Sequence, residues 1–340
     1  MKARALIVPR AQGEETRRDL ADAEWLRTDL AIRVEGDSLV LPLVADAVLP
    51  ASWGEVTEYE FDPRPKEPPS DYRDLIDWPA DERRALPRSF DVIGDIVLVR
   101  LPPELEPRRE EIGEALLAFV PGARIVGWDR GVHGPERRRR IEKIAGSGGW
   151  ASQHRENGVT LEVDVERAYF SPRLAREHAR VAGAVTAGDR VYDLCCGVGP
   201  FAITIARDRR ARSVVAVDAN PAAIELLRRT LSGTASEGVV TPVLASVEEF
   251  LPGRAPVERV ILNLPHEGVK LLPSVAGAVA PGGWLYYYEV VPRTEFARRA
   301  EMIATGLPHA PGWVAAPPHV VHAYSPSSDL VAFTFARRSA

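Results

Sequence analysis

The stretch DLCCGVGPF, residues 193–201, combines residue types that bind a nucleotide-like ligand. Asp193 ends an apolar run, and Gly197 and Gly199 lead into a predicted helix. Glycine turns between a strand and a helix allow the backbone to approach an adenosine-containing ligand closely. Asp218 ends the next predicted strand, where a carboxylate can accept hydrogen bonds from ribose hydroxyls. Together these residues predict an adenosine site.

Several adenosine ligands are compatible with this loop. Residues 197–202 formally satisfy the dinucleotide fingerprint G-x-G-x-x-G/A, so NAD and FAD are alternatives, as is a purely structural glycine turn. Three details favour S-adenosylmethionine. A large region precedes the loop, whereas dinucleotide folds usually open with it. The charge of Asp193 opposes a pyrophosphate and suits the ammonium group of a methionine moiety. RVILNLP, residues 259–265, supplies an Asn-Leu-Pro turn of the kind at which acceptor bases dock in nucleic-acid methyltransferases.

The elements that must hold these residues alternate between strand and helix from Leu174 onward. This alternation predicts an α/β fold of the doubly wound, Rossmann-like type, with a parallel sheet covered by helices on both faces. PAAIELLRRTL, residues 221–231, is a predicted helix, and residues 320–338 predict an antiparallel hairpin that closes the sheet. The predicted strands are RVYDLCC, SVVAVDAN, VTPVLAS, RVILNLP and WLYYYEVV.

Two smaller α+β domains are expected before this region. Residues 1–55 predict a β-α-β-β unit whose hairpin turns at Glu35-Gly36-Asp37. Residues 56–162 predict a second domain with two short strands and an amphipathic helix, and residues 163–340 predict the third and largest domain. The segment 62–70, DPRPKEPPS, has four prolines among nine residues and predicts a linker.

Composition narrows the class of protein. The 340-residue chain has a net charge of -5 and no apolar stretch that approaches a membrane span, so no membrane association is expected. Its only two cysteines are adjacent and cannot join distant segments, which favours a cytoplasmic setting. The seven histidines show no metal-ligand spacing, so no metal site is predicted. A monomer is expected.

The order of several motifs resembles one known family. HRENG (154–158), VDVERAYFSPRLAREHARV (163–181), DLCCGVGPF, VDANP and VILNLP follow one another as in the archaeal and eukaryotic tRNA (guanine-37-N1)-methyltransferases. LPRSFDVIGDIVLVRLP (86–102) is similar to that family's second domain, and the resemblance covers almost the entire chain. It implies an S-adenosylmethionine-dependent enzyme that methylates N1 of guanine 37, with residues 163–340 as a class I methyltransferase domain. It also implies a middle domain that presents the anticodon loop and a first domain that contacts the outer corner of the tRNA.

This chemistry requires a base and a donor, which the resemblance assigns to particular residues. N1 of guanine carries a proton at neutral pH, so a base must remove it, and a donor must stabilise the charge that develops on O6. The resemblance places the base at Glu177 and the O6 donor at Arg137, with Asn263 and Pro265 holding the guanine edge. Tyr169 is expected to pack against the base or the cofactor. The implied cofactor-binding residues are His178, Asp193, Gly197, Gly199, Asp218, Ala219, Ser246, Val247 and Asn263.

Each assignment has a simpler alternative. Glu177 could form a surface ion pair with a neighbouring arginine, and Asn263 could only shape a turn. Arg137 belongs to ERRRR, residues 136–140, in which Arg139 is the nearest rival for the O6 role. Residues 120–146 carry seven Lys or Arg and three Asp or Glu, a local basic patch that suits a phosphate backbone or forms a solvated face.

The chain departs from the family pattern at several positions. His178 stands where the family commonly has arginine, and Ser246 where an acidic residue often meets the adenine amino group. Cys195 and Cys196 replace the usual Phe-Ala and are predicted to be structural. Tyrosines 286–288 are predicted to pack in the sheet.

Three alternative functions stay open at this point. A related enzyme transfers an aminocarboxypropyl group from the same cofactor to a wybutosine precursor, and a bifunctional relative also methylates the tricyclic base. A tRNA-binding protein without catalysis is the third alternative. Cytosine-C5 methylation is disfavoured because no cysteine lies near NLPHEG to attack a pyrimidine ring.

Overall fold

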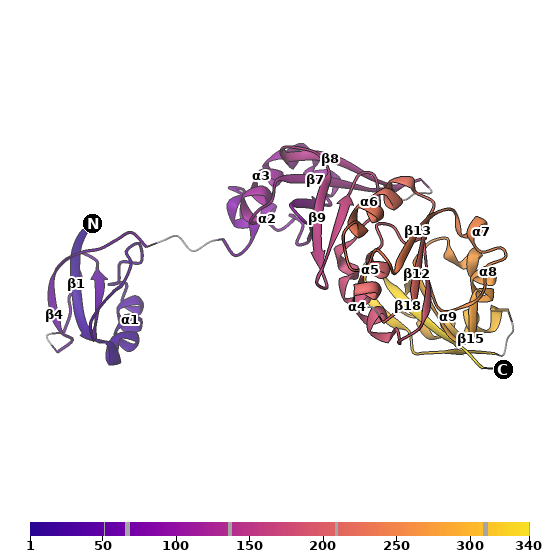
Figure 1. The fold of residues 1–340 in the computed structure, drawn as a ribbon. Helices are drawn as coiled ribbons and strands as arrows, with labels where there is room; N and C mark the ends of the chain where they lie inside the picture. The colour runs from indigo at the N-terminus through magenta and orange to yellow at the C-terminus, as the bar shows by residue number, and fades with distance from the viewer. Residues whose placement is uncertain (51, 65–68, 135–137, 208–209, 309–311, 340) are drawn as a thin grey trace. The chain divides into compact units, whose positions relative to one another are not determined.

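A computed structural model describes residues 1–50, 52–64, 69–134, 138–207, 210–308 and 312–339 (Figure 1). The chain forms two compact units, residues 1–70 and 71–340. The predicted linker falls partly on residues 65–68, which lie outside the described residues. The strand Glu55–Glu60 belongs to the sheet of the first unit, so that unit extends past the predicted boundary at residue 55. Residues 71–340 form one compact unit, and their division into two domains stays a prediction.

The first unit is a four-stranded antiparallel sheet in the order β2-β3-β1-β4 with one helix. The predicted β-α-β-β order is confirmed, and the hairpin turns at Gly36, whose φ of +56° suits glycine. Leu20 of the helix packs against Leu6 and Leu41 of the sheet. The elements are β1 (Lys2–Pro9), α1 (Gly13–Asp22), β2 (Arg33–Glu35), β3 (Ser38–Leu43) and β4 (Glu55–Glu60).

The second unit begins with a four-stranded sheet in the order β5-β6-β7-β8. The two short strands and the amphipathic helix predicted here are confirmed, and the apolar face of that helix packs on the sheet through Ile112 and Leu116. The two long strands were not predicted, because the second includes the arginine run. The elements are α2 (Ala80–Arg83), β5 (Phe90–Ile93), β6 (Ile96–Val99), α3 (Arg109–Phe119), β7 (Ile125–His133) and β8 (Arg138–Gly146).

A separate antiparallel hairpin, β9 (Ala151–Glu156) and β10 (Val159–Asp164), follows this sheet. Leu161 and Val163 of β10 belong to the same core cluster as Leu227 of the later helix α6 (Pro221–Leu231). The HRENG motif therefore forms the turn of a hairpin that packs on the C-terminal part of the unit.

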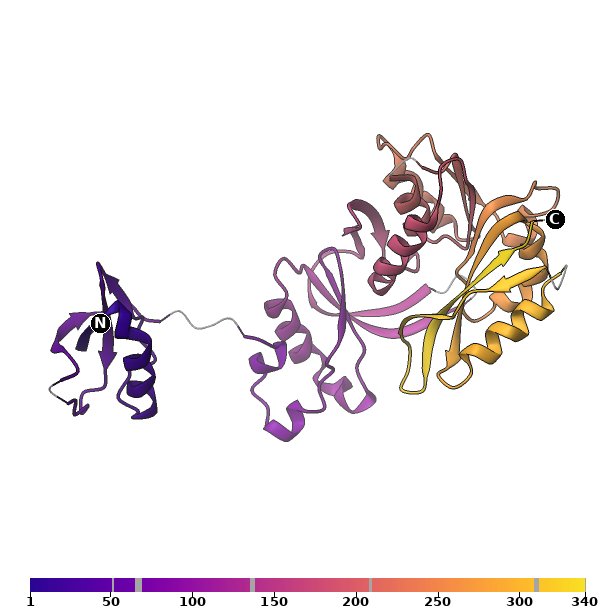
Figure 2. The same ribbon diagram turned by 90° about the horizontal axis from the view of Figure 1, so that it is seen from below.

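The C-terminal part is an eight-stranded sheet in the order β13-β12-β11-β14-β15-β18-β16, with β17 paired to β18. The first four pairings are parallel and those of β18 are antiparallel, so the predicted parallel sheet and closing hairpin are confirmed (Figure 2). The strands are β11 (Arg190–Leu194), β12 (Ser213–Asp218), β13 (Val240–Leu244), β14 (Val257–Leu262), β15 (Val279–Pro292), β16 (Trp313–Ala315), β17 (His319–Ala323) and β18 (Ser328–Arg337).

Helices cover both faces of this sheet (Figure 1). Successive residues of a strand point to opposite faces. Thus Val191 packs with α4 to α6, whereas Tyr192 packs with α7 to α9. Helix α6 spans the predicted residues because Asn220 caps it and Pro221 occupies its first turn. The helices are α4 (Ala175–Ala184), α5 (Pro200–Arg207), α6 (Pro221–Leu231), α7 (Val247–Phe250), α8 (Leu272–Gly277) and α9 (Phe296–Gly306).

The strand order reverses between β11 and β14, which are neighbours although they lie far apart in the sequence. In open α/β sheets, ligands bind beyond the carboxyl ends of the strands at such a reversal. The glycine loop follows β11 and the Asn-Leu-Pro turn follows β14. The topology therefore brings the two sequence motifs to one edge of the sheet.

Candidate cofactor and acceptor site

The glycine loop connects β11 to α5 in a conformation that glycine permits. Gly197 has φ of +56° and Gly199 has φ of +81°. A Cβ atom at Gly199 would lie 2.5 Å from Cδ1 of Leu227, so a side chain there would collide with helix α6. Cys195 also has a positive φ, +63°, which is a strained value for a residue with a side chain. The loop therefore needs its glycines for both turn geometry and close packing.

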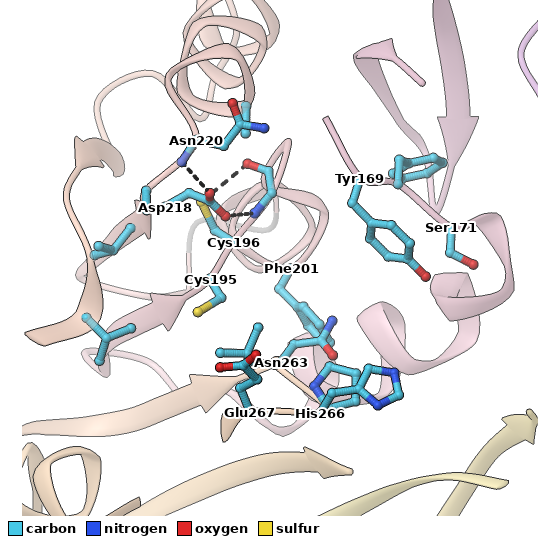
Figure 3. Close-up of a pocket in the computed structure, with 18 of the residues that line it drawn as sticks. Tyr169, Ser171, Cys195, Cys196, Phe201, Asp218, Asn220, Asn263, His266 and Glu267 are labelled. Carbon is cyan, nitrogen blue, oxygen red and sulfur yellow. Dashed lines mark hydrogen bonds between the residues drawn. The ribbon is translucent and has the colours of Figure 1, made fainter. Parts of the chain in front are cut away.

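Asp218 anchors this loop from the end of β12. Its Oδ2 accepts a hydrogen bond from the backbone N–H of Gly197 at 2.7 Å, and its Oδ1 accepts one from the N–H of Asn220 at 2.9 Å (Figure 3). Each carboxylate oxygen has more than one lone pair, so the group can also accept from a ligand. Asp218 lines the cavity described next, and its role in binding a ribose stays a prediction.

A cavity of about 740 Å³ lies between the two motifs. Figure 3 shows Asp218 and Asn220 together at one end, and Asn263, His266 and Glu267 together at another. The predicted residues that line it are Tyr169, His178, Gly197, Asp218, Ala219, Ser246, Val247, Asn263 and Pro265. Other residues that line the cavity were not predicted from the sequence, among them His266, Lys270, His322, Tyr324 and Leu330. Apart from their nearness to the Asn-Leu-Pro turn, His266 and Lys270 carry no sequence signal, and the other three come from the C-terminal hairpin.

Ser246 and the two cysteines take positions that refine their predicted roles. The Ser246 hydroxyl oxygen accepts from the N–H of Glu249 at 3.2 Å and so caps helix α7, while the residue also lines the cavity. Cys195 and Cys196 both line the cavity. Burial raises the pKa of both thiols, which keeps them protonated and unreactive.

Asp193 occupies a different place from the one its sequence position suggested. It is fully buried on the face of β11 that packs with helices α4 to α6, and it is not among the described residues that line the cavity. Its Oδ2 accepts from the N–H of Ala202 at 3.2 Å, and its Oδ1 has no partner within the described part of the chain. Burial raises the pKa of Asp193 to about 8. Here the carboxyl group holds the first turn of α5.

Glu177 is also buried, within a hydrogen-bonded cluster. It is 2% exposed, and it accepts bonds from the Arg180 guanidinium at 2.6 and 2.7 Å and from the Tyr288 hydroxyl at 2.6 Å. His319 Nε2 lies 3.5 Å from Oε2 of Glu177. Glu177 is not one of the described cavity-lining residues. Tyrosines 286–288 are buried in the core on β15, so their predicted packing in the sheet is confirmed, and Tyr288 in addition donates a hydrogen bond to Glu177.

His178, the next residue of α4, does line the cavity. Its Nδ1 lies 2.6 Å from Oε1 of Glu156 on β9, and its ring packs edge-on against Phe201 with centroids 4.5 Å apart. Its Nε2 is buried and has no hydrogen-bond partner among the residues that the structure describes. Adjacent residues of one helix therefore have two different polar environments.

The arginine run divides between the core and the surface. Arg137 lies outside the described residues, and so does the side chain of Arg138. Arg139 is 5% exposed: it pairs with Asp129 and donates from Nη2 to the carbonyl oxygen of Phe170 at 2.9 Å. Its guanidinium carbon lies 5.3 Å from the ring centroid of Tyr169. Arg140, the next residue of β8, is exposed.

Two properties of the described residues bear on the predicted class of protein. Across the described ranges, no group of three or more His, Cys, Asp or Glu residues could hold a metal ion. No described helix is both long and apolar enough to cross a membrane.

Comparison with known proteins adds an independent observation. The TRM5/TYW2 methyltransferase domain matches residues 152–306, the TYW2 N-terminal domain residues 72–149, and the tRNA methyltransferase 5 N-terminal domain residues 5–48. The chain is 35% identical to the tRNA (guanine(37)-N(1))-methyltransferase Trm5b of Pyrococcus abyssi over 84% of this chain and 83% of that protein.

Two other relatives bear on the choice of reaction. A solved complex of aTrm5 and tRNALeu superposes with a TM-score of 0.82 and 29% identity, covering 98% of this chain and 99% of that one. The tRNA(Phe) (4-demethylwyosine(37)-C(7)) aminocarboxypropyltransferase of Pyrococcus horikoshii is 27% identical over 62% of this chain and 74% of that protein.

Proposed function

Because the chain belongs to the archaeal and eukaryotic tRNA (guanine-37-N1)-methyltransferase family, we propose that it transfers a methyl group from S-adenosylmethionine to N1 of guanine 37 in tRNA. One observation carries the proposal: a single cavity joins Asp218, at the end of β12, to Asn263 and Pro265 after β14. A cofactor and an acceptor base can therefore meet within one cavity.

The residues present fit the cofactor. Gly197 and Gly199 keep the loop after β11 free of side chains, and Asp218 offers carboxylate oxygens to a ribose. Val217 and Val247 give an apolar wall for an adenine ring. When bound there, S-adenosylmethionine supplies an electrophilic methyl carbon on a sulfonium. The chain's own task is to hold the guanine edge, remove the N1 proton and stabilise charge on O6.

We assign the guanine edge to Asn263 and Pro265, with Tyr169 as a wall of the cavity. The O6 donor stays assigned to Arg137 by resemblance, and Gly134, the last described residue before it, lines the cavity, which supports the assignment. The burial of Arg139 on Asp129 argues against that rival. The base stays assigned to Glu177 of α4 by resemblance, and His178 beside it stays assigned to the cofactor; His178 lines the cavity, which supports its assignment.

For the finer features, we propose that the first unit contacts the outer corner of the tRNA and that the β5–β8 sheet contacts the anticodon loop. The exposed Arg140 and other basic residues of β8 would then meet phosphates. We also propose that the enzyme acts as a monomer in the cytoplasm.

Transfer of an aminocarboxypropyl group is the main competing function, because an aminocarboxypropyltransferase is among the relatives of this chain and the matching domain model covers both TRM5 and TYW2 proteins. Incubating the protein with unmodified tRNA and S-adenosylmethionine, followed by mass spectrometry of the nucleosides, separates the two. We expect N1-methylguanosine. An aminocarboxypropyl adduct would refute the proposal, and cofactor binding without any product would favour a noncatalytic tRNA-binding protein. Adding tRNA that already carries the tricyclic base tests for a second methylation.

A further inference from the structure

Asp129 and Arg139 form a buried ion pair between strands β7 and β8. Each side chain is 4% exposed, and Nη1 of Arg139 donates to Oδ2 of Asp129. The other carboxylate oxygen of Asp129, Oδ1, accepts from the backbone N–H of Gly131 at 2.9 Å. One carboxylate therefore binds both the neighbouring strand and the backbone of its own strand.

The backbone that Asp129 binds is a β-bulge. The pairing of β7 with β8 shifts between Asp129 and Val132, and Gly131 has φ of +95°. A bulge bends its strand and re-aims the residues that follow, and bulges are common next to active sites. Val132 and Gly134 follow this bulge, and both line the cavity. Asp129 thus fixes the course of β7 just before the strand reaches the cavity.

Arg139 connects this ion pair to the segment before helix α4. Its Nη2 donates to the carbonyl oxygen of Phe170 at 2.9 Å, and its guanidinium carbon lies 5.3 Å from the ring centroid of Tyr169. Phe170, Tyr169 and Ser171 all line the cavity, whereas Arg139 is not one of the described lining residues. Figure 3 shows Tyr169 and Ser171 on one side and Asp218 on another. Arg139 therefore supports one wall of the cavity from behind.

An arginine suits these contacts better than a lysine does. Its planar guanidinium presents several donors in a fixed fork and stacks on aromatic faces, whereas lysine offers one compact ammonium. The guanidinium of Arg139 meets a carboxylate, a carbonyl oxygen and a ring at once. The β7 bulge and the segment that carries Tyr169 therefore keep one relative position, because both contact the same buried group.

A second buried Arg–Asp pair in the same unit provides a comparison. Nε of Arg259 on β14 lies 2.8 Å from Oδ2 of Asp189, and the side chains are 11% and 10% exposed. Arg259 also donates to the Tyr286 hydroxyl at 3.2 Å. Asp189 precedes the first residue of β11, so this pair lies toward the amino ends of the strands, away from the edge that carries the two motifs. None of its three members is a described lining residue of the cavity.

We propose that Asp129 and Arg139 are positioning residues for methyl transfer, which hold Tyr169 and its segment against the acceptor base. This inference rests on the proposed function, in which Tyr169 is a wall of the acceptor site. The pair acts through Tyr169 and Phe170, so its loss lets that wall move away from the base. A misplacement of about 1 Å in a reacting geometry can lower a rate about 10²-fold.

The test compares Arg139→Lys with Arg259→Lys. Both variants keep a cation beside a buried aspartate and lose the guanidinium fork. Single-turnover methyl transfer is measured over a range of tRNA concentrations, at a temperature at which both variants are folded by circular dichroism. Arg139→Lys should lower the saturating rate by about 10- to 100-fold and leave the half-saturating tRNA concentration nearly unchanged. Arg259→Lys should keep the wild-type saturating rate, even where its melting temperature falls as far.

A double-variant cycle tests whether Arg139 acts through Tyr169. Tyr169→Ala removes the ring and should itself lower the saturating rate. Adding Arg139→Lys to Tyr169→Ala should then lower the rate by a smaller factor than in the wild-type background, because the ring that Arg139 supports is gone. If Arg139→Lys does not fold, Asp129→Asn and Asp189→Asn provide the same comparison from the aspartate side.

Four results would overturn the inference. The first is a wild-type saturating rate for Arg139→Lys, and the second is a defect confined to the half-saturating tRNA concentration. The third is an equal loss of rate in Arg259→Lys, which would assign the effect to general stability. The fourth is an unchanged factor in the Tyr169→Ala background. Absence of N1-methylguanosine from the wild-type reaction refutes the proposed function and this inference together, whereas normal wild-type product with an unaffected Arg139→Lys variant refutes the inference alone.

Discussion

The substitution Arg139→Ala should lower the free energy of unfolding of the second unit, although Arg139 belongs to a run of arginines that resembles an RNA-binding stripe. The substitution leaves Asp129, whose side chain is 4% exposed, with the N–H of Gly131 and the mostly exposed Arg100 as its remaining donors. Breaking a buried ion pair costs about 3–5 kcal/mol. Because Arg100 stays 3.4 Å away, we expect about 3 kcal/mol, the lower end.

Thermal and denaturant unfolding measure this loss, with Arg140→Ala as the matched control. A loss of about 3 kcal/mol corresponds to roughly 6 to 12 °C in the melting temperature of a domain of this size. The Arg140 variant should stay within about 0.5 kcal/mol of wild type and should weaken tRNA binding with a shallower salt dependence. In an Asp129→Asn background, Arg139→Ala should cost less, because the charge it leaves behind is gone.

An Arg139→Ala variant that melts at the same temperature as the wild-type protein would contradict this expectation. A variant whose only defect is weaker tRNA binding would also contradict it, because Arg139 would then be a phosphate contact rather than a buried support. Equal costs of Arg139→Ala in the wild-type and Asp129→Asn backgrounds would show that the two side chains do not interact.

Three further predictions concern the cofactor loop. Asp218→Ala should weaken S-adenosylmethionine binding and lower thermal stability, since Asp218 also accepts bonds from Gly197 and Asn220; unchanged affinity by calorimetry would mean that the loop was misread. Because the pKa of Asp193 is raised by burial to about 8, its contribution to stability is complete below its ordinary pKa and is lost as pH rises toward 8. The folding equilibrium constant of Asp193→Asn should therefore rise relative to that of the wild-type protein by up to about tenfold for each pH unit between pH 5 and 8. If the unfolding free energies of the two proteins, measured in urea, change with pH in parallel, this prediction is contradicted. Gly199→Ala should destabilise the protein because its Cβ would meet Leu227, and a wild-type melting temperature would show that α6 can move aside.

Much of the fold could be predicted because its signals are local. Helix α6 has its cap, its proline and its apolar face within residues 220–231. The parallel strands are short apolar runs between such helices, and the resemblance supplied their function. Strand β8 could not be recognised, because alternating burial of arginines depends on Asp129, which lies across the β7–β8 pairing.

The site was predicted in outline and its polar contacts were not. Gly197, Asp218 and Asn263 line one cavity, as their motifs predicted. The sequence placed Asp193 beside the ligand because it precedes the loop, but strand alternation directs it beneath α5. The bonds of Glu177 to Tyr288 and of His178 to Glu156 join residues 111 and 22 positions apart. No local pattern encodes such pairs.

The position of β18 between β15 and β16 has a consequence for synthesis of the protein. Ribosomes make chains at about 5–20 residues per second, and N-terminal domains fold first. The first unit and the β5–β8 sheet can therefore fold while the rest is still being made. Leu330, on the last strand of the sheet, lines the cavity, as do His322 and Tyr324 just before it. A nascent chain thus acquires its β5–β8 sheet well before it has a complete cavity, and methyl transfer must await translation of β18.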